Sequence, residues 1–558
     1  MIKTGAQIVI ECLLEQGVDT VFGYPGGAIL NVYDELYKYS DKITHYLTSH
    51  EQGASHSADG YARATGKVGV VMATSGPGAT NLVTGLATAY MDSVPVVAIT
   101  CNVGCSLLGK DSFQEVDISG ITMPITKHNY IVKDVNKLAD TIREAFYIAN
   151  SGRKGPVLID IPKDVTAQKC EYKYKEPEEI LPATEYKESE IKKAISLIKK
   201  SKRPYVLAGG GVISSGASEQ LAEFVNKVNA PIGNTLMGIS SYPVSEKLFT
   251  GLVGMHGTKA SNFAMTKCDL LVAVGCRFSD RVLSNVKTFI RDKKIIHIDV
   301  DPAEIDKNVP STTSLIGDAK LILETLNANI EQKSNDEWVE TVLEWKKHFP
   351  HQEPVTAEAL TPEYIMKSIG DKAKEDIIIT TEVGQNQMWA AQYYDYVNPR
   401  TLITSGGLGT MGFGTGASMG AQIGCPDKRV VCISGDGSFR MNLNELSTIR
   451  EYNIPVIIII MNNQTLGMVR QWQTLFYKQR YSQTTLDTRG PDFKKLADAY
   501  SIKGFVVKTK EEFESAIKDA LSEREPVLID AKIDMNEFVL PMVAPGKNID
   551  DIIFEVEK

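Results

Sequence analysis

Short apolar runs alternate with longer amphipathic patterns along the whole chain. Each run is rich in β-branched residues and spans only a few positions, which is typical of strands. The predicted strands are Val68–Thr74, Val94–Thr100, Val157–Ile161, Tyr205–Ala208, Leu270–Val274, Ile295–Val300, Val430–Ser434, Val456–Met461 and Val527–Ala531. Strands that are apolar on both faces indicate parallel sheets covered by helices on both sides, so the fold class is α/β.

Two parts of the chain repeat one layout. In each part a strand breaks at a Gly-x-Gly turn before a helical pattern, and two further strands follow in matching order. The matched strands begin at Val70 and Val430, at Val94 and Ile454, and at Pro156 and Pro526. The offsets are 360, 360 and 370 residues. Such nearly constant offsets predict two copies of one layout with a third unit between them.

Two charged, proline-containing stretches, residues 171–188 and 346–362, lack apolar periodicity and are typical of solvated linkers. They divide the chain into predicted domains at 1–170, 188–345 and 360–558. We expect three doubly wound parallel-sheet domains, of which the first and third are alike. In such sheets ligands bind at the carboxyl ends of the strands, where both Gly-x-Gly turns fall.

Composition narrows the class of protein. The 558 residues are 43% hydrophobic and 23% charged, which excludes disordered, collagen-like and disulfide-scaffold chains. The net charge of −9 argues against nucleic acid and anionic membranes as partners but allows small anionic substrates. The longest apolar stretch, Ile454–Met461, is too short for a membrane span.

The start of the chain and the cysteines agree with a cytoplasmic location. Ile8, Val9, Cys12 and Leu13 follow the spacing of an amphipathic helix, without the composition of a signal or transit peptide. The eight cysteines form no CxxC pair, and most lie in apolar runs, where buried thiols are expected. The eight histidines show no zinc spacing, so a zinc enzyme is disfavoured.

Asp436 and Asn463 are candidate metal ligands. Asp436 follows one predicted strand, and Asn463 follows the next one 27 residues later, so both oxygens should meet at one edge of the sheet. Mg²⁺ prefers oxygen ligands and often shares them with phosphate, while glycines and a helix N-terminus offer backbone N–H groups to the phosphate. Each dipeptide alone is an ordinary turn, but both at this spacing favour a metal-bridged diphosphate site.

Glu51 is a candidate functional acid at a predicted helix start. Ser49 and Gln52 fit a capping box, so Glu51 could simply complement the helix dipole. On the residues alone this plain interpretation is favoured. The repeat reverses the preference, because a metal–diphosphate site in one copy and a carboxylate in the other would hold one cofactor across two domains.

A set of longer segments carries a further signal. They are HEQGASHSADGYARATG at 50–66, TSGPGATN at 74–81, FQEVD at 113–117, GPVLIDIPKDV at 155–165, GDGSF at 435–439 with Asn462 and Asn463, and LPMVAPG at 540–546. This combination resembles the thiamine diphosphate enzymes, and most closely the acetohydroxyacid (acetolactate) synthase family, over essentially the whole chain. The resemblance implies decarboxylation of pyruvate and transfer of the remaining two-carbon unit to pyruvate or 2-oxobutyrate. The products would be 2-acetolactate or 2-aceto-2-hydroxybutyrate, precursors of branched-chain amino acids.

By this resemblance, Asp436, Asn463 and the carbonyl of Thr465 hold Mg²⁺ against the diphosphate of thiamine diphosphate. Glu51 reaches over from a second subunit and hydrogen-bonds the aminopyrimidine ring, so active sites exist only in a homodimer or homotetramer. Met411 is the apolar wedge that bends the cofactor, with a core methionine as the plain alternative. The other expected contacts of thiamine diphosphate are Gly384, Gln385, Gly409, Gly435, Gly437 and Ser438.

The central domain resembles the family's FAD site, where the flavin performs no net redox chemistry. The expected FAD contacts are Gly209, Gly210, Gly211, Thr235, Leu236, Met255, His256, Gly275, Arg277, Asp299 and Asp318. Residues 277–281 resemble the family's RFDDR segment, which flavin-free synthases lack, although Ser279 departs from it. Glycine turns alone would be weak evidence for a nucleotide.

The resemblance also implies substrate contacts. Arg281 would pair with the carboxylate of the second 2-oxo acid, and Trp472 would wall the pocket for its alkyl chain. The residues expected at the entrance are Phe113, Gln114 and Lys163. Without the family, a surface ion pair, a packed tryptophan and a helix-start lysine would be preferred. Gly104 and Asn386 stand where the family usually has Pro and His, which bears on inhibitor sensitivity.

Several alternatives stay open. A pyruvate oxidase-like enzyme would use the flavin as an electron acceptor, but Arg281 and the Trp472 segment argue against it. A flavin-free catabolic acetolactate synthase is a second rival. A non-catalytic nucleotide-binding scaffold is disfavoured because Glu51, Asp436 and Asn463 are all present. A separate regulatory small subunit is left open, as is a lid at 541–547 instead of a plain surface tail.

Overall fold

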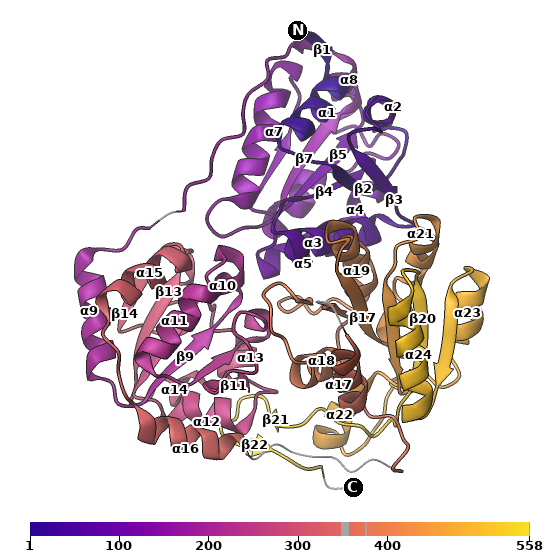
Figure 1. Cartoon of the computed structure of the whole chain (residues 1–558). Helices are drawn as coiled ribbons and strands as arrows, with labels where there is room; N and C mark the ends of the chain where they lie inside the picture. Colours follow the sequence, from indigo (N-terminus) through magenta and orange to yellow (C-terminus); the bar gives the residue numbers. More distant parts are fainter. Residues whose placement is uncertain (183, 348–355, 374–376, 557–558) are drawn as a thin grey trace.

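The computed structural model describes residues 1–182, 184–347, 356–373 and 377–556, and these form three lobes (Figure 1). Each lobe contains one six-stranded sheet in which every strand pair is parallel. The predicted class of three α/β units is therefore confirmed. Of the predicted linker at 346–362, residues 348–355 lie outside the described part of the chain. The domain boundaries stay a prediction.

The first sheet has the strand order β3-β2-β4-β5-β7-β6. Its strands are β2 (Thr20–Tyr24), β3 (Thr44–Leu47), β4 (Gly69–Ala73), β5 (Val96–Asn102), β6 (His128–Ile131) and β7 (Val157–Pro162). Its helices are α1 (Gly5–Glu15), α2 (Leu30–Lys38), α3 (Glu51–Thr65), α4 (Pro77–Thr80), α5 (Val83–Asp92), α6 (Ile118–Thr122), α7 (Val135–Asn150) and α8 (Lys163–Ala167). An antiparallel pair, β1 (Ile2–Thr4) and β8 (Lys169–Glu171), joins the two ends of this unit.

The third sheet has the strand order β16-β15-β17-β18-β20-β19. Its strands are β15 (Ile377–Thr381), β16 (Leu402–Ile403), β17 (Arg429–Gly435), β18 (Ile457–Asn462), β19 (Lys503–Val507) and β20 (Val527–Lys532). Its helices are α17 (Pro362–Lys372), α18 (Gln385–Tyr393), α19 (Phe413–Gly424), α20 (Asp436–Phe439), α21 (Leu446–Glu451), α22 (Gly467–Phe476), α23 (Phe493–Ala499) and α24 (Lys510–Ser522). Counted within each unit, the first and third sheets share the order 2-1-3-4-6-5, which confirms the predicted repeat.

The central sheet has the order β11-β10-β9-β12-β13-β14, which is 3-2-1-4-5-6 within the unit and is the order of dinucleotide-binding folds. Its strands are β9 (Pro204–Ala208), β10 (Ile232–Asn234), β11 (Phe249–Leu252), β12 (Leu270–Val274), β13 (Lys294–Asp299) and β14 (Thr313–Ile316). Its helices are α9 (Glu188–Lys200), α10 (Gly210–Ser215), α11 (Ser218–Val228), α12 (Lys259–Lys267), α13 (Asp280–Leu283), α14 (Val286–Phe289), α15 (Ala319–Asn329) and α16 (Asp336–Lys346).

All nine predicted strands occur within two residues of their expected bounds. The reason is visible in β5, which has no exposed residue. Val97 and Ile99 pack into the cluster that contains α1 and α7, whereas Val96 and Ala98 pack into the cluster that contains α3 and α5. Because both faces are covered, the run must be apolar throughout. Among the described residues, no helix combines the length and the apolar character that crossing a membrane requires.

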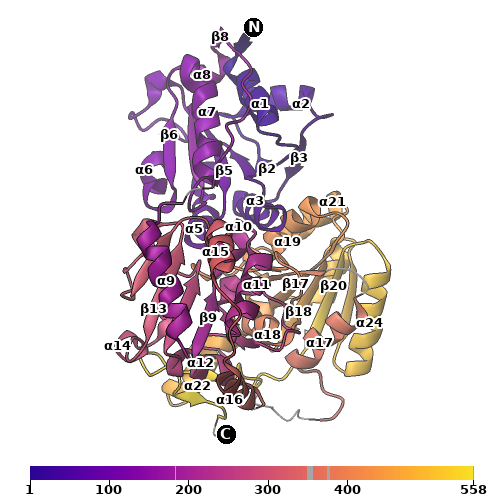
Figure 2. The same cartoon turned by 60° about the vertical axis from the view of Figure 1, so that its left-hand side comes forward.

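Helices α3 and α19 join the first and third units (Figures 1 and 2). They approach through glycines. A Cβ at Gly60 would lie 2.1 Å from the Ala417 carbonyl oxygen, and a Cβ at Gly420 would lie 1.8 Å from the Ser57 carbonyl oxygen. The Ser57 hydroxyl donates to the Gly416 carbonyl at 3.0 Å. Backbone thus meets backbone across the junction, at positions where a larger side chain has no room.

The carboxyl-terminal segment crosses back to the central unit. It forms a short antiparallel pair, β21 (Met542–Val543) and β22 (Ile552–Ile553). The Val543 N–H donates to the Met255 carbonyl at 2.7 Å, and Ile549 lies in the hydrophobic cluster of the central unit. Residues 541–543 are buried, so the alternative of a plain surface tail is wrong for this part of segment 541–547. Residues 545–547 are exposed. A lid at 541–547 stays a prediction.

Candidate functional site

A small cavity of about 80 Å³ lies at the carboxyl ends of β17 and β18. The two strands are parallel neighbours, with Gly435 opposite Met461. Asp436 follows β17 as the first residue of α20, and Asn463 follows β18. Both side chains line the cavity together with Thr465, Gly437 and Ser438. The predicted metal ligands therefore meet at one sheet edge.

The Asp436 carboxylate is only partly satisfied within the protein. The residue is buried, and its Oδ1 has no hydrogen-bond partner among the described residues. Burial raises the pKa of Asp436 to about 7. A buried carboxylate without a partner is costly, and a bound cation would remove that cost. The side chain is thus suited to a metal ion.

Amide side chains organise the rest of this cavity. The Asn463 Nδ2 group donates to Gln385 Oε1 at 3.1 Å, and its Oδ1 accepts from the Thr465 N–H at 3.3 Å. Gln385 in turn donates to Gln471 Oε1 at 3.0 Å. The predicted contacts Gly384 and Gly435 also line this cavity, and Gly409 lines the larger one described below. Asn386 also lines the small cavity, and its Oδ1 lacks a hydrogen-bond partner among the described residues.

Met411 lines the same cavity, on a loop that leads into α19. Behind it lies Glu382, a fully buried carboxylate that the sequence interpretation missed. Glu382 accepts from the backbone N–H groups of Gly412 at 2.6 Å and Thr415 at 3.2 Å, which belong to the start of α19. Burial raises its pKa to about 7, although these N–H groups oppose the shift. Its position directly after β15 was the signal that could have found it.

A large cavity of about 1300 Å³ lies between the three units, beyond the roughly 300–1000 Å³ of ordinary small-molecule sites. It brings together most residues predicted for FAD, namely Gly210, Gly211, Thr235, Leu236, Met255, His256, Gly275, Arg277, Asp299 and Asp318. Burial lowers the pKa of His256 to about 4, so its ring is neutral near pH 7. Gly209 is not part of the described lining; a Cβ there would lie 2.1 Å from the Gly275 carbonyl oxygen.

The first unit also lines this cavity, which the sequence did not indicate. Its contributors are Met91, Asp92, Ser93, Gly152, Arg153 and Lys154. Arg153 bridges to the central unit through Asp301 at 3.1 Å and Glu304 at 2.7 Å. The large cavity is thus built by all three parts of the chain.

Arg281 and Trp472 share one wall of the large cavity. The Arg281 side chain is 61% exposed, and its nearest carboxylate, Asp280, is 3.9 Å away. Its guanidinium also contacts the Met255 sulfur at 3.6 Å. Trp472 packs against Met255 and Met542. An accessible cation thus stands near an apolar wall, which suits a small 2-oxo acid.

Glu51 is on neither of these two cavities in its own chain. It is buried as the first residue of α3, and its Oε2 accepts from Asn81 Nδ2 at 2.9 Å. The predicted capping box is wrong, because the N-cap is His50, whose Nδ1 accepts from the Gln52 N–H at 3.1 Å. Ser49 instead donates to the Asn444 carbonyl at 3.0 Å.

The predicted entrance residues also lie away from both cavities. Lys163 is exposed at the start of α8, and Phe113 is 87% exposed. Gln114 has a positive φ of 59°, and its backbone lies against the Gly76 turn. Within the described residues, no three His, Cys, Asp or Glu side chains cluster as a metal site, and all eight cysteines are free thiols.

Comparisons with known proteins agree with this arrangement. Residues 3–121 match the N-terminal TPP-binding domain of thiamine pyrophosphate (thiamine diphosphate) enzymes, residues 191–326 match their central domain, and residues 382–531 match their C-terminal TPP-binding domain. The chain is 48% identical, over 98% of its length, to the probable acetolactate synthase large subunit of Methanocaldococcus jannaschii, of which it covers 95%. The chain belongs to the acetolactate synthase large subunits, a family of thiamine pyrophosphate-dependent enzymes.

Other acetolactate synthase large subunits match as fully. The one from Porphyra purpurea is 44% identical over 98% of this chain and 94% of its own length. The one from Haemophilus influenzae is 42% identical over 99% of this chain and 98% of its own length. The two TPP-binding models fall on the first and third units, which share one strand order. The predicted family is therefore confirmed.

Proposed function

We propose that this acetolactate synthase decarboxylates pyruvate and joins the remaining two-carbon unit to a second pyruvate or to 2-oxobutyrate. The products are 2-acetolactate and 2-aceto-2-hydroxybutyrate, in the biosynthesis of valine, leucine and isoleucine. The observation that carries this is the buried Asp436 carboxylate, unpartnered at one oxygen, beside Asn463 in a TPP-binding domain. Such a pair is suited to Mg²⁺ and a diphosphate.

Asp436, Asn463 and the carbonyl of Thr465 hold Mg²⁺ in this proposal, and the α20 N-terminus with Gly437 and Ser438 receives the diphosphate. When bound, thiamine diphosphate supplies a carbon nucleophile and an electron sink. Met411 packs against it from the α19 side. The start of α20 and the ends of β17 and β18 provide fixed supports for these contacts.

Glu51 holds a proton beside the pyrimidine ring of the cofactor bound by a second copy of the chain. The support for this is that Glu51 is buried with one amide partner, yet lines neither cavity of its own chain. The same second copy brings Gln114, Lys163 and Phe113 to the entrance. The active assembly is therefore a homodimer or a homotetramer of such dimers.

The large cavity holds FAD, which takes part in no net redox step. The order of the central sheet, the cavity size and the glycines around it support a dinucleotide. Arg281 binds the carboxylate of the second 2-oxo acid, and Trp472 packs against its alkyl chain. Residues 541–543 are buried, and Met542 belongs to the cluster against which Trp472 packs, so this segment would help to keep water from the Trp472 wall.

A separate small subunit is a further proposed partner, because the matched relatives are named as large subunits. We expect that subunit to modify the activity and not to supply residues to either cavity. The cytoplasmic location stays a prediction from the sequence.

The test is an acetolactate assay with pyruvate, thiamine diphosphate and Mg²⁺, with FAD added or omitted. We expect acetolactate only when both the thiamine cofactor and FAD are present. Full activity of a colourless protein would instead indicate a flavin-free synthase. Formation of acetate or acetyl phosphate with bleaching of the flavin would indicate a pyruvate oxidase-like enzyme.

A further inference from the structure

The turn at 405–410 separates the two cavities. Residues 405–409 line the large cavity, and Met411 lines the small one. The turn belongs to the third unit, between β16 and α19. Any shift of this turn would therefore change the walls of both sites together.

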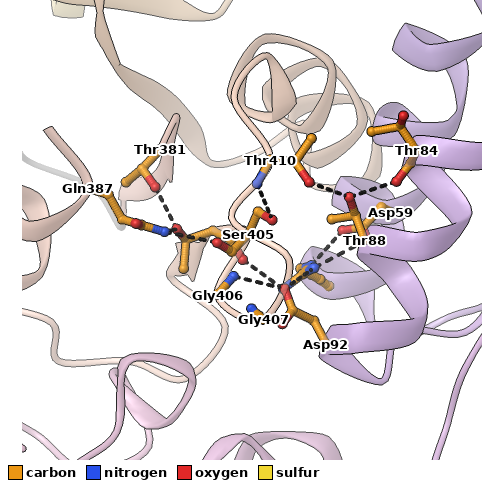
Figure 3. A network of polar contacts seen from close by, with 12 residues as sticks. Asp59, Thr84, Thr88, Asp92, Thr381, Gln387, Ser405, Gly406, Gly407 and Thr410 are labelled. Atoms are coloured by element: carbon orange, nitrogen blue, oxygen red, sulfur yellow. Dashed lines mark hydrogen bonds and ion pairs between the residues drawn. The ribbon is translucent and has the colours of Figure 1, made fainter. Parts of the chain in front are cut away.

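The side chain of Asp92, in the first unit, binds backbone N–H groups of this turn (Figure 3). The carboxylate accepts from the Gly406 N–H at 3.0 Å and from the Gly407 N–H at 2.7 Å. Asp92 is the last residue of α5, and its side chain is fully buried. Charge-assisted hydrogen bonds of this kind are about twice as strong as neutral ones.

Arg63 completes the charge balance around Asp92. Its guanidinium donates to Asp92 Oδ2 at 3.0 Å, to Asp59 Oδ1 at 2.5 Å and to the Thr404 carbonyl at 2.9 Å. Burial raises the pKa of Asp59, while the charge of Arg63 opposes the shift. The first unit thus presents a buried ionic network to residues on both sides of Ser405.

Neutral hydrogen bonds fix the remaining parts of the turn (Figure 3). The Thr88 and Thr410 hydroxyls lie 2.7 Å apart, and the Thr410 N–H donates to the Ser405 hydroxyl at 3.0 Å. On the opposite side, Gln387 donates to the Thr404 hydroxyl at 2.6 Å and to the Ser405 carbonyl at 3.1 Å. The turn is thus hydrogen-bonded to the first unit on one side and to α18 of its own unit on the other.

Close packing explains two of the three glycines in this turn, Gly406 and Gly407. A Cβ at Gly407 would lie 2.9 Å from Asp92 Oδ1 and 3.0 Å from the Met91 Cβ. A Cβ at Gly406 would lie 2.3 Å from the sulfur of Met237, in the central unit. The turn therefore contacts the first unit on one side and the central unit on another.

We propose that Asp92 is a positioning residue for the flavin, because it fixes the glycine turn that walls the large cavity. This rests on the proposed function, in which that cavity holds FAD. The first unit then affects how tightly the flavin is held, although the sheet with the dinucleotide-binding strand order belongs to the central unit. The ligand concerned is the dinucleotide itself, and Asp92 acts on it through Gly406 and Gly407.

The test compares Asp92→Asn with the wild-type enzyme by titrating FAD and following the quenching of flavin fluorescence. An asparagine would direct an amide N–H₂ either toward both Arg63 and Gly406 or toward Gly407, so we expect FAD affinity to fall about tenfold or more. In the acetolactate assay the FAD concentration for half-activation should rise by a similar factor, and saturating FAD, by returning the turn to its position, should restore kcat toward the wild-type value. Thr88→Val should give a smaller effect in the same direction.

Glu15→Gln is the matched control. Glu15 is also a buried carboxylate of the first unit, paired with Arg143 at 2.8 Å, but it lines neither cavity. Its variant should be destabilised without a change in FAD affinity. Unchanged FAD affinity in folded Asp92→Asn and Thr88→Val, or an equal loss in Glu15→Gln, would overturn the inference alone. Wild-type protein that binds no FAD would overturn the proposed flavin site, and the inference with it.

Discussion

The first and third units share one strand order but carry different chemistry at the same place. After the third strand of the first unit, the turn at Gly76 packs against the backbone of Gln114. A Cβ added at Gly76 would lie 2.9 Å from the Gln114 carbonyl oxygen. After the third strand of the third unit, Asp436 faces a cavity with one oxygen unpartnered among the described residues. One scaffold thus supplies a filled turn in one copy and an open binding edge in the other.

The helices after the second strands differ in a related way. In the first unit the carboxylate at the helix start is Glu51, the first residue of α3. In the third unit it is Glu382, which comes from the end of the neighbouring strand and accepts N–H groups of α19. Both helix N-termini thus face an acidic side chain, the kind of residue that the helix dipole favours there. The comparison teaches that the fold fixes where charge is needed, while the sequence decides which residue supplies it.

Glu51→Gln tests the carboxylate of the first copy and should have the largest effect. Acetolactate formation should fall by roughly 100-fold or more, since a positioned acid–base group contributes about that much. The melting temperature should change little. Asp41→Asn, an exposed acid of the same unit, is the control and should keep full activity. Turnover of Glu51→Gln close to wild type would remove Glu51 from the proton-holding role.

Asp436→Asn tests the open edge of the third unit. The Mg²⁺ concentration for half-maximal activity should rise by more than the roughly 10–100-fold that loss of an outer-shell partner costs. Binding of thiamine diphosphate, followed by calorimetry at fixed Mg²⁺, should weaken in parallel. Asp427→Asn, an exposed acid in the same unit, should leave both quantities unchanged. An unaltered Mg²⁺ requirement in Asp436→Asn would contradict the metal assignment.

Gly420→Ala tests the contact between α3 and α19, which joins the first and third units within one chain. The added methyl group would meet the Ser57 carbonyl at 1.8 Å, so α3 and α19 must separate. We expect a loss of roughly 1–3 kcal/mol in the free energy of unfolding. Urea denaturation followed by circular dichroism measures it. Gly490→Ala, with no atom within 4 Å of the added group, should unfold like wild type. Equal stability of the two variants would argue against a tight junction.

Glu382 predicts a smaller effect that depends on pH. Its folded pKa, raised by burial to about 7, lies above the ordinary 4.5 of an unfolded glutamate. The folded state therefore binds the proton more tightly, and this contribution to stability is complete below pH 4.5 and lost as the pH rises through 7. The slope is at most about 1.4 kcal/mol per pH unit. The melting temperature of wild type minus that of Glu382→Gln should fall from pH 5 to pH 8, because only the glutamate titrates; a constant or rising value would contradict the assignment.

Much of the fold follows from local pattern. The run at Val456–Met461 is apolar because β18 is covered on both faces, so its bounds could be predicted to one residue. The repeat offsets fixed the equivalence of β4 with β17, because two sheets of one topology space their strands alike. Asp436 and Asn463 could be paired for the same reason, since they end neighbouring strands.

The missed features all depend on contacts between distant parts of the chain. Ser49 does not cap α3, because its hydroxyl is engaged by Asn444, 395 residues away. Asp92 is an ordinary helix-end acid in the sequence, and its role depends on Gly406, 314 residues away. Glu382 follows a strand, but the N–H groups that it accepts belong to residues 30 and 33 positions away. Such pairings are set by how the units dock, which local periodicity does not encode.

The bond between Val543 and Met255 has a consequence for how the protein is made. A ribosome releases the chain from its amino end, and domains generally fold as they emerge. The central unit therefore folds long before residues 542–549 exist, and it must wait with one hydrophobic flank uncovered. That flank is covered only after the third sheet has been made, because residues 542–549 follow its last strand in the chain. We expect chains interrupted before residue 540 to be captured by chaperones, even though all three sheets are already complete.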